Sequence, residues 1–118
     1  YDAKGLFLAS VADDQPVLFL EHRWLYKNTG QVPAEIYTLP LGQAAFLRRG
    51  SKATVVATSL AAMQTLAACE QQGLDVDLID PRTIKPLDID TIVASVQRTG
   101  RLLVVDHDFP FGGFAAEV

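Results

Sequence analysis

The chain is poor in several features that would point directly to a class of protein. Only one of its 118 residues is cysteine, Cys69, so no internal disulfide can form, as is usual in a reducing compartment. The net charge of −4 provides no electrostatic attraction for nucleic acid or anionic lipid. The longest apolar runs, such as residues 102–105, are far shorter than the about 18 residues that cross a bilayer, and no signal-peptide pattern opens the chain. We therefore expect a soluble, intracellular protein with neither nucleic acid nor membrane as a partner.

Nearly half of the residues are hydrophobic and a fifth are charged, which is typical of a globular protein with a packed core. The length fits one compact domain and leaves no room for a second complete one. The chain begins at Tyr1 without a methionine and stops at Val118, just after Gly112-Gly113 opens what reads as a further helix. We expect it to be a piece of a longer protein.

The first 40 residues predict one helix, one strand and a connecting segment. Asp2 is a candidate N-cap for a helix that ends before Pro16. Residues 16–20 form a continuous apolar run, which predicts a strand buried on both faces. Residues 21–40 show no sustained period and contain glycine and proline, so we expect them to connect two structural units.

From Leu41 onward the pattern becomes regular. Residues 44–48 predict an edge strand, and the β-branched run at 53–58 predicts a buried one. Ser59 is a candidate cap for a helix over residues 60–72, which Gly73 would end in a left-handed conformation.

The second half of this region repeats the alternation of strand and helix. Residues 76–80 predict a strand, Asp88 a helix cap, and Gly100 the end of that helix. The side chains expected to face the sheet follow helical spacing: Ile89, Ile92, Val93 and Val96. A third strand is predicted at 102–106. Alternating strands and helices imply an α/β fold with three layers and a mostly parallel sheet.

Ligands of open parallel sheets bind at the carboxyl ends of the strands. That edge carries Ser59, Asp80 and His107, in the order of the hydrolase triad of nucleophile, acid and base. However, the sequence around Ser59 lacks the glycines of a nucleophile elbow. We therefore interpret Ser59 as a helix cap and Asp80 as a turn residue, and we predict no catalytic residue in this chain.

Other polar groups have simpler interpretations as well. Asp106-His107-Asp108 contains metal-binding residue types, but consecutive side chains at a strand end diverge, so we expect a solvated or interface loop. We expect His22 to act as a cap or to bond a neighbouring domain. Gly112-Gly113 lacks a basic neighbour and is better explained as a tight turn than as a phosphate cradle. Cys69 lies among small apolar residues and is expected to be an inert buried thiol.

Several segments, taken in order along the chain, resemble the β subunit of 2-oxo-acid dehydrogenase E1 components, the family of the pyruvate, branched-chain 2-oxo-acid and acetoin dehydrogenases. They are Asp2-Ala3-Lys4-Gly5-Leu6, Leu18-Phe19-Leu20-Glu21-His22, Tyr37-Thr38-Leu39-Pro40-Leu41-Gly42, Asp80-Pro81-Arg82-Thr83-Ile84-Lys85-Pro86-Leu87-Asp88 and Gly112-Gly113-Phe114-Ala115-Ala116-Glu117. This similarity covers nearly the whole chain.

The resemblance implies an enzyme that uses thiamine diphosphate and Mg²⁺ to decarboxylate a 2-oxo acid and passes the acyl group to a lipoyl arm on E2. Its expected partners are an E1 α subunit or domain, a second β subunit and the E2 acyltransferase. Its expected location is the cytoplasm, or the mitochondrial matrix in a eukaryote. The family's catalytic glutamate and histidine lie upstream of Tyr1, so this chain alone is expected to bind no thiamine diphosphate.

The resemblance also implies a division of the chain. Residues 1–27 would be the end of a pyrimidine-binding domain, 28–40 a linker, and 41–118 an incomplete transketolase-type C-terminal domain. This segment would serve subunit assembly and E2 docking. The alternative is a non-catalytic transketolase-like docking or assembly module.

Many family members hold a structural potassium ion in the turn that follows the first helix. The matching positions here are Ser10, Asp13 and Gln15, with Gln15 where asparagine is usual. Oxygen ligands suit such a hard cation. No cofactor-binding residue is predicted in this chain.

Overall fold

The computed structural model describes residues 1–109 and 111–118. These residues divide into two compact units, Tyr1–Leu41 and Gly42–Val118. No helix in the described residues is both long and apolar enough to cross a membrane.

The first unit contains one α-helix, α1 (Asp2–Ala12), and a 3₁₀ helix, η1 (Arg23–Lys27). The N-cap position is Tyr1, and Asp2 lies in the first turn. The prediction of Asp2 as the cap is therefore off by one residue, although its carboxylate still sits near the positive end of the helix dipole. Residues 33–39 are tied to α1, because the Leu39 amide donates to the Gly5 carbonyl at 3.1 Å and the Tyr1 and Tyr37 rings stack at 4.8 Å.

The predicted strand at 16–20 is wrong. These residues are extended but form no strand, and Leu18 and Leu20 are 83% and 75% exposed. A strand requires a partner for its backbone hydrogen bonds. None of the described residues of the first unit forms a strand, so the apolar run has no ladder to join.

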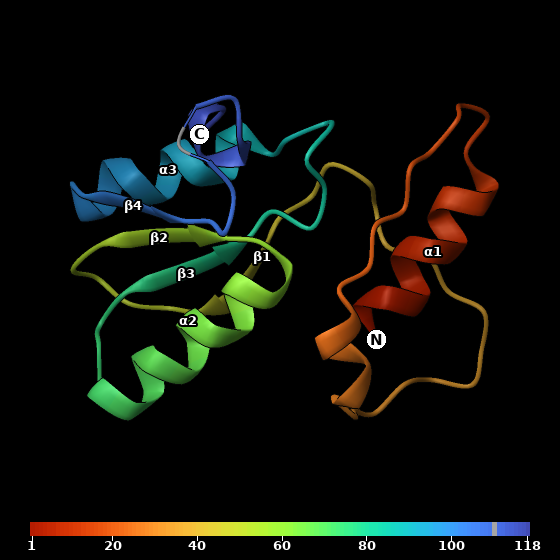
Figure 1. Ribbon diagram of the computed structural model, residues 1–118, viewed down its shortest axis with the longest axis horizontal. Coiled ribbons are helices and arrows are strands. Elements are labelled where there is room, and N and C mark those ends of the chain that lie inside the picture. The colour runs from red at the N-terminus through yellow and green to blue at the C-terminus, as the bar shows by residue number, and fades with distance from the viewer. Residues whose placement is uncertain (110) are drawn as a thin grey trace. The chain divides into compact units, whose positions relative to one another are not determined.

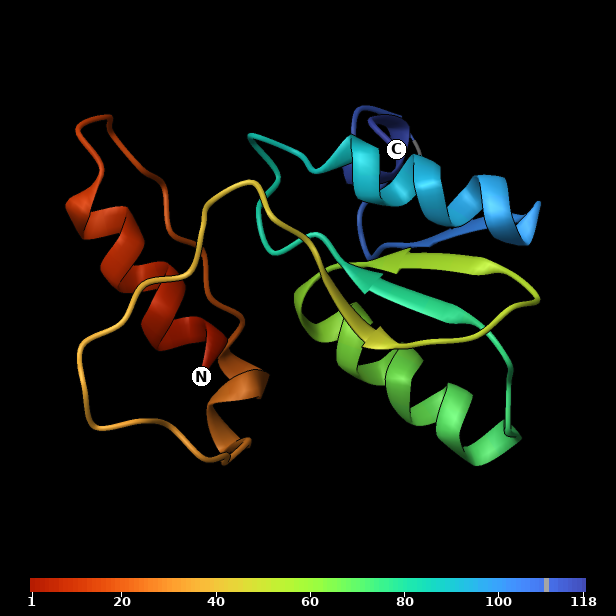
Figure 2. The same cartoon turned by 180° about the vertical axis from the view of Figure 1, so that it is seen from behind.

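The second unit is a four-stranded sheet with a helix on each face (Figures 1 and 2). Its strands are β1 (Ala45–Arg48), β2 (Thr54–Ala57), β3 (Asp77–Asp80) and β4 (Leu102–Val105). They are arranged in the order β1-β3-β2-β4, with β2 parallel to both β3 and β4, and β1 antiparallel to β3. The prediction of a largely parallel, three-layer α/β unit is confirmed.

One helix packs on each face and creates its own core. On one face α2 (Ser59–Gln72) buries Val55, Leu78 and Cys69. On the other, α3 (Ile89–Thr99) buries Val56, Ile79 and Ile92. The final 3₁₀ helix, η2 (Phe114–Ala116), takes the place of the helix expected after Gly112-Gly113.

Helix ends follow the sequence in most cases. Gly73 and Gly100 end α2 and α3 with φ of +61° and +70°, where glycine carries no steric penalty. Ser59, however, does not cap α2: the N-cap is Thr58, while Ser59 is the first helical residue and has a φ of +51°. A cap residue needs extended backbone, which Thr58 has and Ser59 lacks.

The buried face of α3 is rotated from the predicted one. Ile92 and Ser95 are buried, whereas Ile89 and Val93 are more than 40% exposed. The inward stripe follows residues 92, 95, 96 and 99, which includes two hydroxyl residues. An apolar pattern alone cannot identify such a stripe, because its polar members are buried only through specific hydrogen-bond partners.

Candidate functional site

The carboxyl edge of the parallel strands is where the connections to the two helices begin. The chain leaves β2 toward α2 on one face of the sheet and leaves β3 toward α3 on the other. Adjacent strands whose connections diverge in this way create a topological switch point between them. Two non-glycine residues lie there with left-handed backbone, Ser59 with φ +51° and Arg82 with φ +60°.

Polar groups at this edge bond to loop backbone. Asp80 Oδ1 accepts from the Arg82 amide at 2.9 Å. The hydroxyl of Thr83 accepts from the Gly42 amide at 2.9 Å and donates to the Pro86 carbonyl at 2.8 Å. These bonds shape the connection from β3 to α3, and they agree with the interpretation of Asp80 as a turn residue.

Asp88 links this connection to β1. Its carboxylate accepts from the Thr91 amide at 3.1 Å as the N-cap of α3, as the sequence predicts, and from the Ala44 amide at 2.9 Å. Burial raises the pKa of Asp88, but the hydrogen bonds from Ala44 and Thr91 outweigh it, so its pKa lies below the ordinary value. The group is held ionised as an acceptor.

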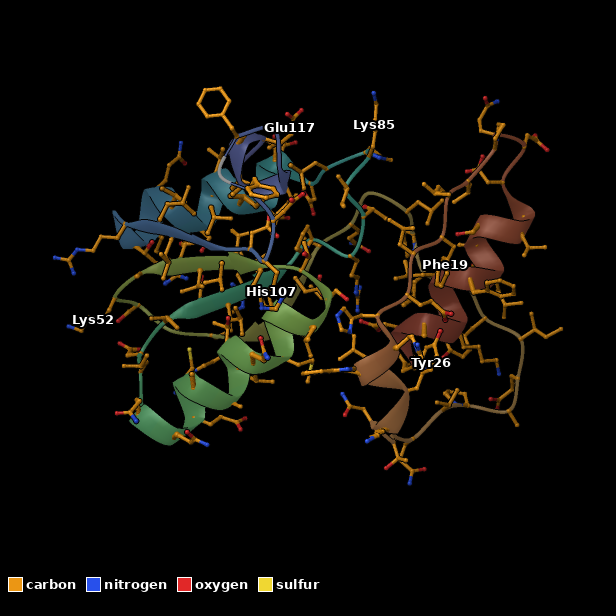
Figure 3. The ribbon with its side chains drawn as sticks, in the orientation of Figure 1. Phe19, Tyr26, Lys52, Lys85, His107 and Glu117 are labelled. Atoms are coloured by element: carbon orange, nitrogen blue, oxygen red, sulfur yellow. The ribbon has the colours of Figure 1, made fainter. Side chains whose placement is uncertain are left out.

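The segment after β4 is an exposed turn. Asp106 Oδ1 accepts from the Asp108 amide at 3.3 Å, and its Oδ2 accepts from the Ala115 amide at 3.2 Å. His107 is exposed at the carboxyl end of β4 (Figure 3). Among the described residues no group of three or more His, Cys, Asp or Glu side chains is placed to hold a metal ion. His107 and Asp108 are exposed, as either a solvated or an interface loop requires.

The histidine of the first unit has a local role. His22 Nδ1 accepts from the Trp24 amide at 3.3 Å and so caps η1, which confirms the capping prediction. Trp24 itself is 71% exposed. Tyr26 on the same 3₁₀ helix donates to Glu21 at 3.0 Å, and this bond, together with the charge of Glu21, raises the pKa of the phenol (Figure 3).

The three residues of the predicted potassium site lie at the carboxyl end of α1. The Ser10 hydroxyl donates to the Leu6 carbonyl at 2.8 Å, and Asp13 Oδ1 accepts from the Gln15 amide at 2.8 Å. A shallow hollow of about 400 Å³ borders Asp13 and the last turn of the helix. No basic residue occupies the last turn of the helix, where the unpaired backbone carbonyls carry partial negative charge.

A buried polar network lies at the opposite end of the sheet, where β2 and β3 begin, and was not predicted. Asp77, fully buried at the start of β3, accepts from Ser95 Oγ at 2.7 Å and from the Gly50 amide at 2.9 Å, and pairs with Arg98. Thr54 Oγ1 extends the network to Ser95 and Thr99 at 2.7 and 2.8 Å. Thr54 and Asp77 could have been noticed as polar residues inside buried strands. Lys52 lies at this same end of the sheet, away from His107 (Figure 3).

The sequence matches known proteins along its whole length. It is 43% identical over 120 residues to the "Pyruvate dehydrogenase E1 component subunit beta" of Rickettsia felis, covering 99% of this chain and 37% of that protein. It is 43% identical to the protein of the same name from Bacillus subtilis, covering 100% and 38%. It is also 38% identical to the "Acetoin:2,6-dichlorophenolindophenol oxidoreductase subunit beta" of Cupriavidus necator, covering 100% and 36%. The chain therefore spans a little over a third of the length of these curated relatives.

The fold comparison agrees with the sequence. A structure described as "Split gene transketolase, inactive beta4 tetramer" superposes with a TM-score of 0.58 at 22% identity, covering 74% of this chain and 30% of that one. The family model "Transketolase, C-terminal domain" matches residues 42–118. This range coincides with the second compact unit of the structure. The chain belongs to the transketolase C-terminal domain family, and its sequence relatives are β subunits of 2-oxo-acid dehydrogenase E1 components.

Proposed function

We propose that this chain is part of the β subunit of a thiamine-diphosphate-dependent 2-oxo-acid dehydrogenase E1 component, in which it serves subunit assembly and E2 docking. The observation that supports this most is the similarity to pyruvate and acetoin dehydrogenase β subunits over 99–100% of the chain. In this proposal residues 1–27 end the pyrimidine-binding domain, 28–40 form a linker, and 41–118 begin the C-terminal domain.

The local chemistry is consistent with a supporting role. Asp80, Asp88 and Asp106 each accept hydrogen bonds from loop or helix amides. Carboxylates used in this way are fixed as structural acceptors. The decarboxylation step, with thiamine diphosphate and Mg²⁺ as cofactors, is assigned to residues of the intact enzyme outside this chain.

Docking requires exposed groups with apolar surface, and the loop after β4 presents them. Phe109 and Phe111 are 79% and 98% exposed. Aromatic side chains of this kind contribute strongly to protein interfaces. We assign this loop to contact with the E1 α chain or with E2.

The potassium proposal concerns the turn after α1. Ser10, Asp13 and Gln15 offer a hydroxyl, a carboxylate and an amide oxygen beside the carbonyl end of the helix, and this donor set fits a hard monovalent cation. A bound ion there would steady the turn between α1 and residues 16–20.

The first test is purification of the parent protein from its cells, with its intact mass and its co-purifying chains measured. We expect an E1 α chain and E2, and thiamine-dependent oxidation of a 2-oxo acid by the purified assembly. Purification without either partner and without this activity would overturn the proposal. Recovery with partners but without turnover would favour the non-catalytic assembly module.

A second test addresses docking directly. Phe111→Ser should weaken binding of the parent protein to the α chain or to E2 by about tenfold, because the loss of an interface aromatic costs about 1.4 kcal/mol or more. The control is Val93→Ser, at an exposed apolar position on α3. Unchanged affinity of the Phe111 variant for both partners would exclude this loop as the docking contact.

A further inference from the structure

Lys4 on α1 binds the segment that leads toward the second unit. Its ammonium group donates to three consecutive backbone carbonyls, those of Pro33, Ala34 and Glu35, at 2.6, 3.3 and 2.8 Å. It also lies 5.1 Å from the centre of the Tyr37 ring, within the range of a cation–π interaction. An ammonium group has three donors, so the whole hydrogen-bonding capacity of Lys4 is used to hold this segment.

Gly5, the next residue of α1, leaves the space in which the same segment lies. Gly5 is buried, and a Cβ at this position would come within 2.6 Å of Leu39 Cγ and 2.8 Å of Tyr37 Cε2. Its carbonyl accepts from the Leu39 amide at 3.1 Å, and the Tyr37 hydroxyl donates to the Tyr1 carbonyl at 2.6 Å. We call residues 33–39 the strap, since these contacts fix them along the first turns of α1.

The second unit holds its own end of the chain from Gly42 onward. The Gly42 amide donates to the Thr83 hydroxyl at 2.9 Å, and that hydroxyl donates to the Pro86 carbonyl at 2.8 Å. Gly42 has a φ of +79°, and a Cβ there would come within 2.8 Å of Pro86 Cγ. The chain is therefore fixed to the second unit three positions after Leu39, where it is fixed to the first.

Pro40 and Leu41 are the two residues between these fixed points. The ring of Pro40 holds its own φ at about −65° and restricts the residue before it to extended backbone. The torsions that remain free to rotate are mainly the ψ of Pro40 and the φ and ψ of Leu41. Two residues span about 7 Å at most, whereas a free linker over residues 28–40 would span roughly 45 Å when extended.

We propose that Pro40 and Leu41 form the hinge between the two units, and that Lys4 and Gly5 keep this hinge short by binding the strap to α1. The inference uses only contacts within each unit and is independent of the proposed function. It narrows the expected linker of residues 28–40 to two residues. A hinge of this kind takes up relative movement of two domains in a few torsions. Release of the strap would lengthen the connection and let the two units move more independently.

Backbone amide relaxation, measured by NMR on the whole chain, tests where the flexibility lies. We expect order parameters of about 0.85 through the strap, as in α1, and a value below about 0.6 at Leu41. A free linker would instead give values below about 0.6 throughout residues 33–39, and that result would overturn the proposal. A value of about 0.85 at Leu41 would overturn it as well, because no hinge would remain there.

Two substitutions test what holds the strap. Lys4→Met removes the donors to the three carbonyls, and Gly5→Ala adds the Cβ that meets Leu39 and Tyr37. Each should speed hydrogen exchange of the Leu39 amide at least tenfold and lower the order parameters of the strap, while the chemical shifts of α1 stay helical. Because alanine favours a helix more than glycine does, Gly5→Ala should not weaken α1 itself.

The matched controls change the same residue types elsewhere in the first unit. Lys27→Met removes an exposed ammonium group from η1, and Gly30→Ala adds a methyl group with no atom within 4 Å. Neither should alter exchange of the Leu39 amide. Unchanged exchange in either Lys4→Met or Gly5→Ala, or an equal increase in the controls, would overturn the proposal.

Discussion

Ser95 Oγ on α3 donates a hydrogen bond of 2.7 Å to Asp77 Oδ2 on β3, and both residues are buried. Burial raises the pKa of Asp77, but the bonds from Ser95 and Gly50 and the charge of Arg98 outweigh it, so its pKa lies below the ordinary value. The carboxylate is thus held ionised inside the sheet edge and connects α3 to the core.

The pKa of Asp77 predicts a loss of stability in acid. Because the folded-state pKa is depressed, its contribution is complete above the unfolded value of about 3.9 and is lost as the pH falls through the folded one. Asp77→Asn places an amide donor against the donors Ser95 and Arg98, and should cost about 1–3 kcal/mol at neutral pH. Denaturant titrations between neutral pH and acid should show a shallower pH dependence for the variant.

Glu70→Gln is the control, since it removes one negative charge from an exposed position on α2. Some acid sensitivity should remain in Asp77→Asn, because the pKa of Asp88 is also lowered. An unaltered pH dependence in Asp77→Asn would contradict this account.

Asp88 should contribute more to the free energy of unfolding than an ordinary helix cap does. Asp88→Ala removes the acceptor of both the Thr91 and the Ala44 amides. The cap alone is worth about 1 kcal/mol, and the second orphaned amide adds about as much again. Chemical denaturation should therefore show a loss of about 2 kcal/mol.

Asp90→Ala provides the comparison, because Asp90 lies exposed in the first turn of the same helix. A loss equal to that of Asp88→Ala would mean that the helix dipole, rather than the two bonds of Asp88, is responsible.

Gly50 marks a close approach of two backbone segments. A Cβ there would overlap the backbone nitrogen of Val76, and rigid backbone cannot move aside as a flexible side chain can. Gly50→Ala should lower the free energy of unfolding by more than about 2 kcal/mol, as overpacking does. Gly30→Ala, where no atom lies within 4 Å of the added methyl group, should leave stability nearly unchanged in the same thermal melts.

Potassium should stabilise the turn after α1. Replacing choline chloride by potassium chloride at constant ionic strength should raise the melting temperature of the chain, and Asp13→Ala should abolish that rise. Asp14→Ala, at the neighbouring exposed carboxylate, should retain it. Equal melting temperatures in the two salts would argue against an ion at Ser10, Asp13 and Gln15.

Much of the second unit could be predicted because its local patterns agree with its tertiary structure. The β-branched run in β2 and the glycines after α2 and α3 behave as the sequence indicates. Asp88 is the best example, since the same residue type that predicts a helix start also provides the observed bond to Thr91.

The errors arise where long-range partners decide the structure. The run at 16–20 has the composition of a strand but no neighbouring strand among the described residues of its unit. The inward face of α3 depends on two residues more than 17 positions away in sequence. Asp77 accepts a hydrogen bond from Ser95, and the Thr54 hydroxyl forms another with it. At the candidate site, residue types are enough to predict capping roles. They do not predict the left-handed backbone of Ser59 and Arg82, because that depends on how two connections leave the sheet.

The central strand β2 has a consequence for the way the second unit opens. Val55 and Ala57 belong to the core beneath α2, while Val56 belongs to the core beneath α3, and β2 is paired on both sides. Neither helix layer can detach without exposing part of this strand. We therefore expect the two layers to open as one cooperative unit, with the amide protons of β2 exchanging with solvent only when the whole unit unfolds.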